Sequence, residues 1–123
     1  LLNLLADAAA AGKQIQVILD PAQQKVNQSA IDKLKASGAL VRNYPASDKQ
    51  KLSARFALFD GKSSLVGSAN WTNSSFVINH ELAVLAPSKA VTERLAQHFN
   101  EDWQKSKEIE TKTQGTGTQA AKP

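Results

Sequence analysis

The chain has 123 residues, of which 41% are apolar and 21% are charged, and its formal net charge is +4. This size and composition predict one soluble globular domain with one core, and no apolar run approaches the roughly 20 residues that cross a bilayer, which excludes a transmembrane segment. Cysteine is absent, which excludes disulfides and cysteine nucleophiles, and the only two histidines, His80 and His98, are too far apart in the sequence to predict a zinc site.

The first residues of the chain predict a helix. Residues 1–12 place leucine and alanine at helical spacing and end at Gly12, a residue type that commonly terminates helices. They have neither a basic start nor a cleavage pattern, so we do not interpret them as a signal peptide. Because methionine is absent even at position 1, we expect a processed or truncated chain.

Strands and helices are expected to alternate after this helix. Residues 14–20 are β-branched and apolar, which predicts an interior strand ended by Pro21. Residues 28–37 have the apolar spacing of a short amphipathic helix that stops at Gly38, and residues 40–44 predict the next strand.

The second half of the chain continues the alternation. Two apolar runs, 55–59 and 64–67, are separated by D-G-K, which is the composition of a tight hairpin turn. Residues 81–85 predict the last strand, and residues 88–106 predict the longest helix, with apolar residues recurring every four positions. The C-terminal residues show no periodicity, so we expect a domain at 1–107, truncated at its N-terminus, and a disordered tail at 108–123. This alternation predicts an α/β fold, a mixed β-sheet flanked by helices.

Segment 53–81 carries the most regular pattern of polar residues. It reads S-A-R-F-A-L-F-D-G-K-S-S-L-V-G-S-A-N-W-T-N-S-S-F-V-I-N-H-E. This pattern resembles the phospholipase D superfamily, in which HxKxxxxD is followed, after six intervening residues, by GSxN. The residues that match position for position are Asp60, Gly67, Ser68 and Asn70. The histidine position holds Ser53, however, and the lysine position holds Arg55.

The resemblance implies roles for the residues at the family's positions. Cleavage of a phosphodiester requires positive charge and hydrogen-bond donors around the phosphate oxygens, together with a nucleophile and an acid. The implied phosphate cradle consists of Arg55, Ser68 and Asn70, and arginine suits it because its guanidinium binds phosphate oxygens with two prongs. The positions of the family's catalytic residues and their support are held by Ser53, Arg55, Asp60 and Glu81. Glu81 would orient a histidine that is absent here, so it is expected to pair with Arg55 instead.

Ordinary structural roles compete with these assignments. An aspartate before a glycine is common in β-turns, and Ser68 or Asn70 could cap a following helix or satisfy loop backbone groups. Arg55 lies in an apolar run, where a charge needs a partner. Because the four matching residues keep one register, we favour the phosphate site. Ser53 is not favoured as a nucleophile since no base lies near it in the motif, and His80 and His98 are expected to be surface or packing residues.

The charge distribution favours an anionic partner. Residues 33–62 contain seven basic residues and two acids, so this segment carries +5 while the whole chain carries +4. A nucleic acid or an anionic phospholipid headgroup suits such a surface. The few aromatic residues do not indicate a base-stacking platform.

The sequence thus predicts a domain that binds phosphodiesters and whose phosphodiesterase activity is lost or impaired, because Ser53 replaces the catalytic histidine. The chain resembles the small bacterial nuclease branch of the family, in which two halves share one site. We therefore expect a homodimer or pairing with a second phospholipase D-like half. A bacterial periplasmic or secreted location is slightly favoured over the cytoplasm. Two alternatives stay open: an active phosphodiesterase or endonuclease completed by a histidine of another half or chain, and a non-catalytic protein-interaction module. No metal or other cofactor is expected.

Overall fold

The computed structural model describes residues 1–47 and 49–111, and it has the predicted α/β class. Its elements in chain order are α1 (Leu2–Ala10), β1 (Gln16–Leu19), the 3₁₀ helix η1 (Pro21–Gln23), α2 (Gln24–Ala36), β2 (Leu40–Asn43), β3 (Phe56–Phe59), β4 (Ser63–Gly67), α3 (Asn73–Val77), β5 (Ala83–Ala86), α4 (Lys89–Lys105) and β6 (Lys107–Glu108). Every predicted helix and strand is present with shifted ends. The sequence did not predict η1, α3, β6 or the first turn of α2.

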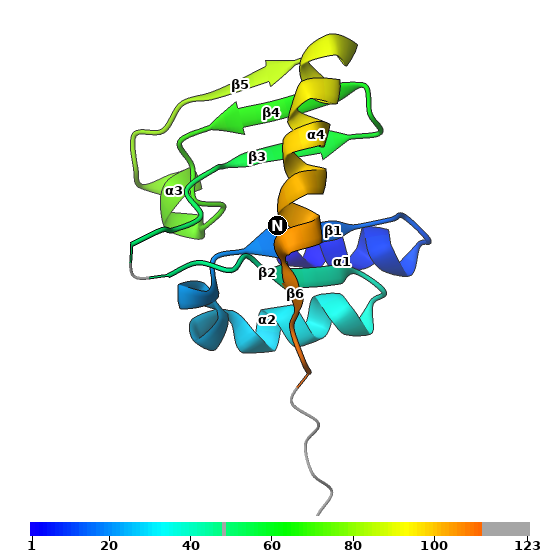
Figure 1. Ribbon diagram of the computed structural model, residues 1–123, viewed down its shortest axis with the longest axis vertical. Helices are drawn as coiled ribbons and strands as arrows, with labels where there is room; N and C mark the ends of the chain where they lie inside the picture. The colour runs from blue at the N-terminus through cyan, green and yellow to red at the C-terminus, as the bar shows by residue number, and fades with distance from the viewer. Residues whose placement is uncertain (48, 112–123) are drawn as a thin grey trace, which may run out of the picture.

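The strands form two three-stranded sheets rather than the one mixed sheet that was expected. In the first sheet β1 pairs with β2 in parallel and β6 pairs with β2 antiparallel. In the second sheet β3, β4 and β5 pair antiparallel in chain order. Figure 1 shows the two sheets one above the other, with β1 and β3 as their neighbouring edges.

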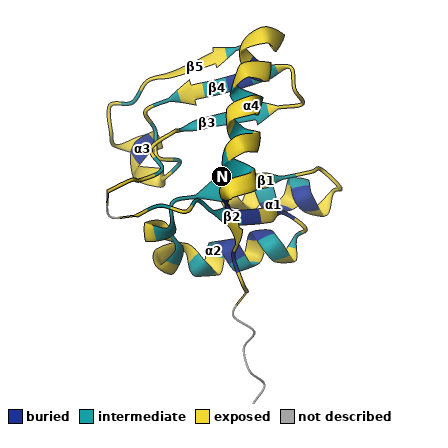
Figure 2. Cartoon of the chain, in the orientation of Figure 1, coloured by how far each residue is buried: buried dark blue, intermediate teal, exposed yellow. Residues whose placement is uncertain are grey.

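The most deeply buried apolar residues lie around the first sheet. Figure 2 shows the buried positions concentrated in α1, α2 and β2, whereas most of the second sheet is half-buried or exposed. The core cluster consists of Ala6, Ala9, Ile31, Leu34, Ala39, Val41 and Ile109. Burying a side chain such as Ile31, which is 1% exposed, contributes about 1.5–3 kcal/mol.

Helix α4 connects the two sheets. It crosses both of them in Figure 1, and its N-terminal half packs on β3 and β4. Near its C-terminal end, Arg42 of β2 donates a hydrogen bond to the carbonyl of Trp103 (2.9 Å), and its guanidinium lies 4.3 Å from the centre of the Trp103 ring. The predicted apolar stripe is only partly covered, because Val91 is 44% exposed while Thr92 is fully buried.

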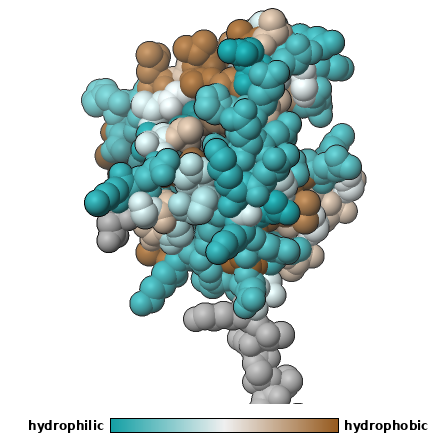
Figure 3. All heavy atoms as spheres, in the orientation of Figure 1, coloured by the Kyte–Doolittle hydropathy of each residue, from teal (hydrophilic) through white to brown (hydrophobic). Residues whose placement is uncertain are grey.

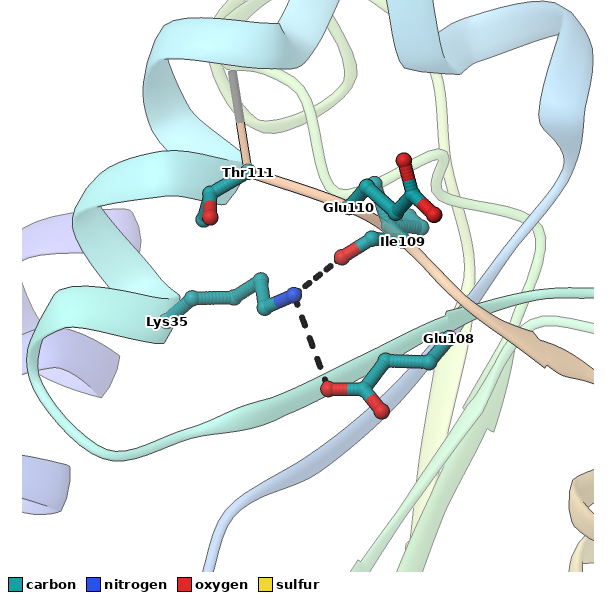
Figure 4. A pocket seen from close by; sticks show the side chains of 5 residues that line it. All are labelled: Lys35, Glu108, Ile109, Glu110 and Thr111. Carbon is teal, nitrogen blue, oxygen red and sulfur yellow. Dashed lines mark hydrogen bonds and ion pairs between the residues drawn. The ribbon is translucent and has the colours of Figure 1, made fainter. Parts of the chain in front are cut away.

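The end of the described chain is attached to α2. Figure 4 shows Lys35 of α2 between the Ile109 carbonyl, to which it donates a hydrogen bond, and the Glu108 carboxylate, which lies 3.6 Å away. Glu110 and Thr111 complete the rim of this surface hollow, which contains none of the predicted site residues. Packing therefore extends to Ile109. Residues 112–123 of the expected tail lie outside the described residues.

Candidate phosphate-binding site

The second sheet brings the polar residues of the motif to one end. Phe56 of β3 lies opposite Val66 of β4, and Gly67 of β4 lies opposite Ala83 of β5. Arg55 therefore comes just before β3, Ser68 follows directly after β4, and Glu81 precedes β5 by two residues. The three short strands are neighbours in one sheet, in the order β3-β4-β5.

Gly67 allows β4 and β5 to approach closely at this end. A Cβ atom on Gly67 would lie 2.5 Å from the Leu82 carbonyl oxygen and 2.8 Å from the Ala83 Cα. No side chain larger than hydrogen fits without moving the backbone. The approach also joins Ser68 to Leu82 by two hydrogen bonds, one from the Ser68 N–H to the Leu82 carbonyl (3.0 Å) and one from the Leu82 N–H to the Ser68 hydroxyl (3.2 Å).

Arg55 and Asn70 form the first of two side-chain pairs. The Nε–H of Arg55 donates to Oδ1 of Asn70, and Nη1 donates to the Ser53 carbonyl at 3.2 Å. With its oxygen turned to Arg55, the Asn70 amide retains both N–H groups of Nδ2, and Arg55 retains those of Nη2. Within 1–47 and 49–111 these groups have no hydrogen-bond partner, so two kinds of donor remain for an anion.

Ser68 and Glu81 form the second pair. The Ser68 hydroxyl donates to Oε2 of Glu81, and Nδ2 of Asn79 donates to Oε1 at 3.3 Å. The hydrogen bond from Ser68 lowers the pKa of Glu81 below its usual 4.5; burial opposes this, while Asn79, Ser75 and the charge of Arg55 add to it. Glu81 is therefore ionised at neutral pH.

Two details of this arrangement differ from the sequence-based assignment. The Ser68 proton is committed to a carboxylate, so Ser68 can donate to phosphate only after turning away from Glu81. The expected ion pair between Glu81 and Arg55 is absent from the described residues, where Arg55 binds Asn70 and the Ser53 carbonyl and acts on Glu81 at longer range.

The short helix α3 fixes the backbone that follows Asn70. Trp71 has φ +60, a left-handed conformation that is uncommon for a tryptophan, and its ring packs edge-on against Phe76. Thr72 caps α3 by accepting a hydrogen bond from the Ser75 N–H at 3.2 Å. The alternative in which Ser68 or Asn70 caps this helix is therefore wrong. Threonine is among the residue types preferred at helix N-caps, so Thr72 itself was the signal for this helix start in the sequence.

Asp60 lies at the opposite end of the β3–β4 hairpin. Asp60 and Gly61 have φ +54 and +65, and the Lys62 N–H donates to the Phe59 carbonyl at 3.0 Å, which describes a type I′ turn. Asp60 lies five positions along an extended chain from Arg55, about 16 Å away. The geometry therefore gives Asp60 a turn role and separates it from the other predicted site residues.

The side chains of Ser53, His80 and His98 are exposed and make no hydrogen bond with the other described residues of the site. Ser53 is exposed, and the hydrogen bond that it makes uses its backbone carbonyl. His80 and His98 are both exposed, as expected for surface residues. Over the described ranges, no group of three or more histidine, aspartate or glutamate side chains could hold a metal ion, and no helix is long and apolar enough to cross a membrane.

Comparison with known proteins identifies the family behind this arrangement. Residues 1–103 match the family model described as cardiolipin synthase, PLD-like domain. This chain belongs to the phospholipase D-like family. The match covers the second sheet, strands β1 and β2 of the first sheet and most of α4, so the phospholipase D-like assignment does not depend on the short GSxN motif alone.

Curated relatives and solved structures agree with the phospholipase D-like assignment. The chain is 29% identical to the mitochondrial cardiolipin hydrolase of Xenopus tropicalis over 93 residues, which cover 76% of this chain and 43% of that protein. It is 30% identical to the mitochondrial cardiolipin hydrolase of Chlamydomonas reinhardtii over 94 residues, which cover 75% of this chain and 40% of that protein. It thus spans less than half the length of these relatives. Its fold is similar to that of Nuc from Salmonella typhimurium, a phospholipase D family member, with a TM-score of 0.80 and 18% identity over 88% of this chain and 72% of Nuc. TrmBL2, an archaeal chromatin protein with a novel mode of DNA binding, gives a TM-score of 0.64 at 16% identity, covering 88% and 39%.

Proposed function

We propose that this phospholipase D-like domain binds phosphodiesters at Arg55 and Asn70 and has lost or impaired hydrolytic activity. The contact between these two side chains carries the proposal, because it orients the asparagine amide and leaves N–H donors on both residues. Charge-assisted hydrogen bonds of this kind suit phosphate oxygens. The family's general action on phosphodiesters supports the ligand class.

The loss of activity follows from the residue at the nucleophile position. Ser53 is exposed, and a serine hydroxyl attacks phosphorus only when a base removes its proton. No histidine hydrogen-bonds to it within the described residues. Removing a catalytic nucleophile that works with its partners typically lowers turnover by about 10⁶.

Binding of a soluble diester tests the proposal. The unmodified chain should bind bis(4-nitrophenyl) phosphate in a calorimetric titration, and Arg55→Ala should weaken that binding. Hydrogen bonds to charged groups contribute about 1.5–3 kcal/mol, so the expected loss is about 10- to 100-fold. The matched control is Arg94→Ala, which removes an exposed arginine from α4. Equal losses from both variants would show non-specific charge attraction and reject the cradle.

The natural ligand is proposed more broadly, as a nucleic acid or an anionic phospholipid headgroup. The similarity to cardiolipin hydrolases supports the lipid, and the fold similarity to the DNA-binding chromatin protein TrmBL2 supports the nucleic acid. A filter-binding assay with single-stranded DNA and flotation with anionic vesicles distinguish them. Loss of one interaction but not the other in Arg55→Ala identifies the ligand that the cradle holds.

A second candidate is a site shared with another chain or half that supplies the missing histidine. It is supported by exposed apolar residues beside the cradle, where Phe76, Val77 and Ile78 are 59%, 71% and 73% exposed. Figure 3 also shows apolar atoms gathered along the molecule's β5 edge, where Val84 and Leu85 are exposed. Sedimentation tests self-association: a monomer at every accessible concentration counts against a homodimer. Because a homodimer holds Ser53 in both copies, the motif histidine itself would have to come from a different phospholipase D-like half.

A further inference from the structure

Ser75 lies between the two side-chain pairs of the site. It is in the first turn of α3 and is 3% exposed, although its side chain is polar. A buried hydroxyl requires hydrogen-bond partners, and the identity of those partners shows what the residue holds in place.

The Ser75 hydroxyl oxygen accepts two hydrogen bonds. The backbone N–H of Asn70 donates to it at 3.1 Å, and the Thr72 hydroxyl donates to it at 3.1 Å. A hydroxyl can accept two hydrogen bonds and donate one. Both acceptor positions are therefore occupied, and the Ser75 proton is left to donate elsewhere.

The hydrogen bonds that reach the Glu81 carboxylate come from Ser68 and Asn79, and the Ser75 side chain acts on it more weakly. The Ser75 side chain is one of the groups that lower the pKa of Glu81, after Ser68 and Asn79. One buried hydroxyl thus holds the backbone of Asn70, whose side chain binds Arg55, and also lowers the pKa of Glu81, which binds Ser68.

The backbone at this point needs such a restraint. Trp71, directly after Asn70, is in the left-handed region, which is unfavourable for residues with a Cβ. The hydrogen bond from the Asn70 N–H to the Ser75 hydroxyl fixes the peptide group between Ala69 and Asn70. Without that bond, relaxation of Trp71 would rotate the asparagine side chain away from Arg55.

We propose that Ser75 is a positioning residue of the phosphate cradle, whose hydroxyl holds Asn70 against Arg55 through the hydrogen bond from the Asn70 N–H. This inference rests on the proposed function for its effect on ligand affinity. Its effect on Glu81 and on the Asn70 amide is independent of any ligand.

Three variants separate positioning from helix capping. Ser75→Ala removes the hydroxyl while leaving the Ser75 N–H that Thr72 caps. Thr72→Val removes the cap while leaving the hydrogen bond from Asn70 to Ser75. Ser74→Ala is the matched control, because this neighbouring serine is exposed.

Three measurements are made on each variant: affinity for bis(4-nitrophenyl) phosphate, the amide signal of Asn70 in a ¹⁵N spectrum, and the pKa of Glu81 from the ¹³C shift of its carboxyl group. Ser75→Ala should weaken diester binding about 3- to 10-fold, the range for one net hydrogen bond. It should also shift the Asn70 amide signal and raise the pKa of Glu81. Ser74→Ala should change none of the three.

The outcomes decide between two roles. If Ser75→Ala leaves both the Asn70 signal and the Glu81 pKa unchanged, the positioning role is wrong. If Thr72→Val reproduces both changes, capping of α3 explains them and the positioning role is also wrong. If the unmodified chain binds no diester, the proposed function fails, and the two ligand-free measurements still decide the role of Ser75.

Discussion

Replacing Gly67 by alanine tests whether close packing of β4 on β5 builds the candidate site. The added Cβ would lie 2.5 Å from the Leu82 carbonyl oxygen and 2.8 Å from the Ala83 Cα. Both neighbours are backbone atoms, which cannot rotate out of the way, so the two strands must separate. We expect a cost of about 3 kcal/mol, at the upper end of overpacking penalties. In a domain of this size that cost lowers the Tm by roughly 12 °C or more.

Urea unfolding followed by circular dichroism measures this cost, and Gly12→Ala provides the comparison. Gly12 has φ +90, but an added Cβ there meets no atom within 4 Å. That variant carries only backbone strain, about 1–2 kcal/mol. Separation of the strands should also loosen the contact between Ser68 and Leu82 and raise the pKa of Glu81. The reasoning is refuted if Gly67→Ala costs no more than Gly12→Ala.

Three further predictions concern chemistry, pH and the hairpin turn. The double variant Ser53→His with Arg55→Lys should hydrolyse a chromogenic diester much faster than the unmodified chain, because Glu81 is already ionised and hydrogen-bonded by Ser68. No gain in rate would mean that the site does not support phosphoryl transfer. Activity of the unmodified chain that is abolished by Ser53→Ala would overturn the assignment as inactive. Because the pKa of Glu81 is lowered in the folded state, the stability that Glu81 contributes should be present above about pH 4.5 and lost as the pH falls through the folded-state pKa. Urea unfolding midpoints measured at several pH values should show this loss. Glu81→Gln should remove that part of the pH dependence. Asp60→Asn should leave diester affinity unchanged in the same calorimetric titration, since asparagine also tolerates the left-handed turn; a marked loss would place Asp60 in the binding machinery.

The sequence predicted most of the regular elements because their patterns are local. The β3–β4 hairpin followed from two apolar runs around an aspartate and a glycine, and the turn has the positive φ values that these residues favour. The division into two sheets was missed, since pairing between strands depends on contacts that no local pattern records. Strand β6 was also missed, because two residues in a polar stretch carry no periodicity.

For the candidate site, the motif predicted which residues gather but not how they pair. In the structure the motif residues Arg55, Ser68, Asn70 and Glu81 lie at one end of the second sheet. The motif did not reveal that Ser68 gives its proton to Glu81, or that Arg55 binds Asn70 rather than the carboxylate. These choices depend on side-chain distances of a few ångströms, which residue spacing does not determine.

The unequal burial of the two sheets has a consequence for conformational opening. The main core lies around β1, β2, α1 and α2, while the sheet that carries the candidate site is mostly half-buried or exposed. Helix α4 packs on that sheet and is fastened to the other by Arg42. Segments with few buried apolar contacts open locally at a lower free energy than global unfolding requires. Strands β3–β5 should therefore exchange their amide hydrogens sooner than β2, so the site can open to a bulky ligand while the rest of the domain stays folded.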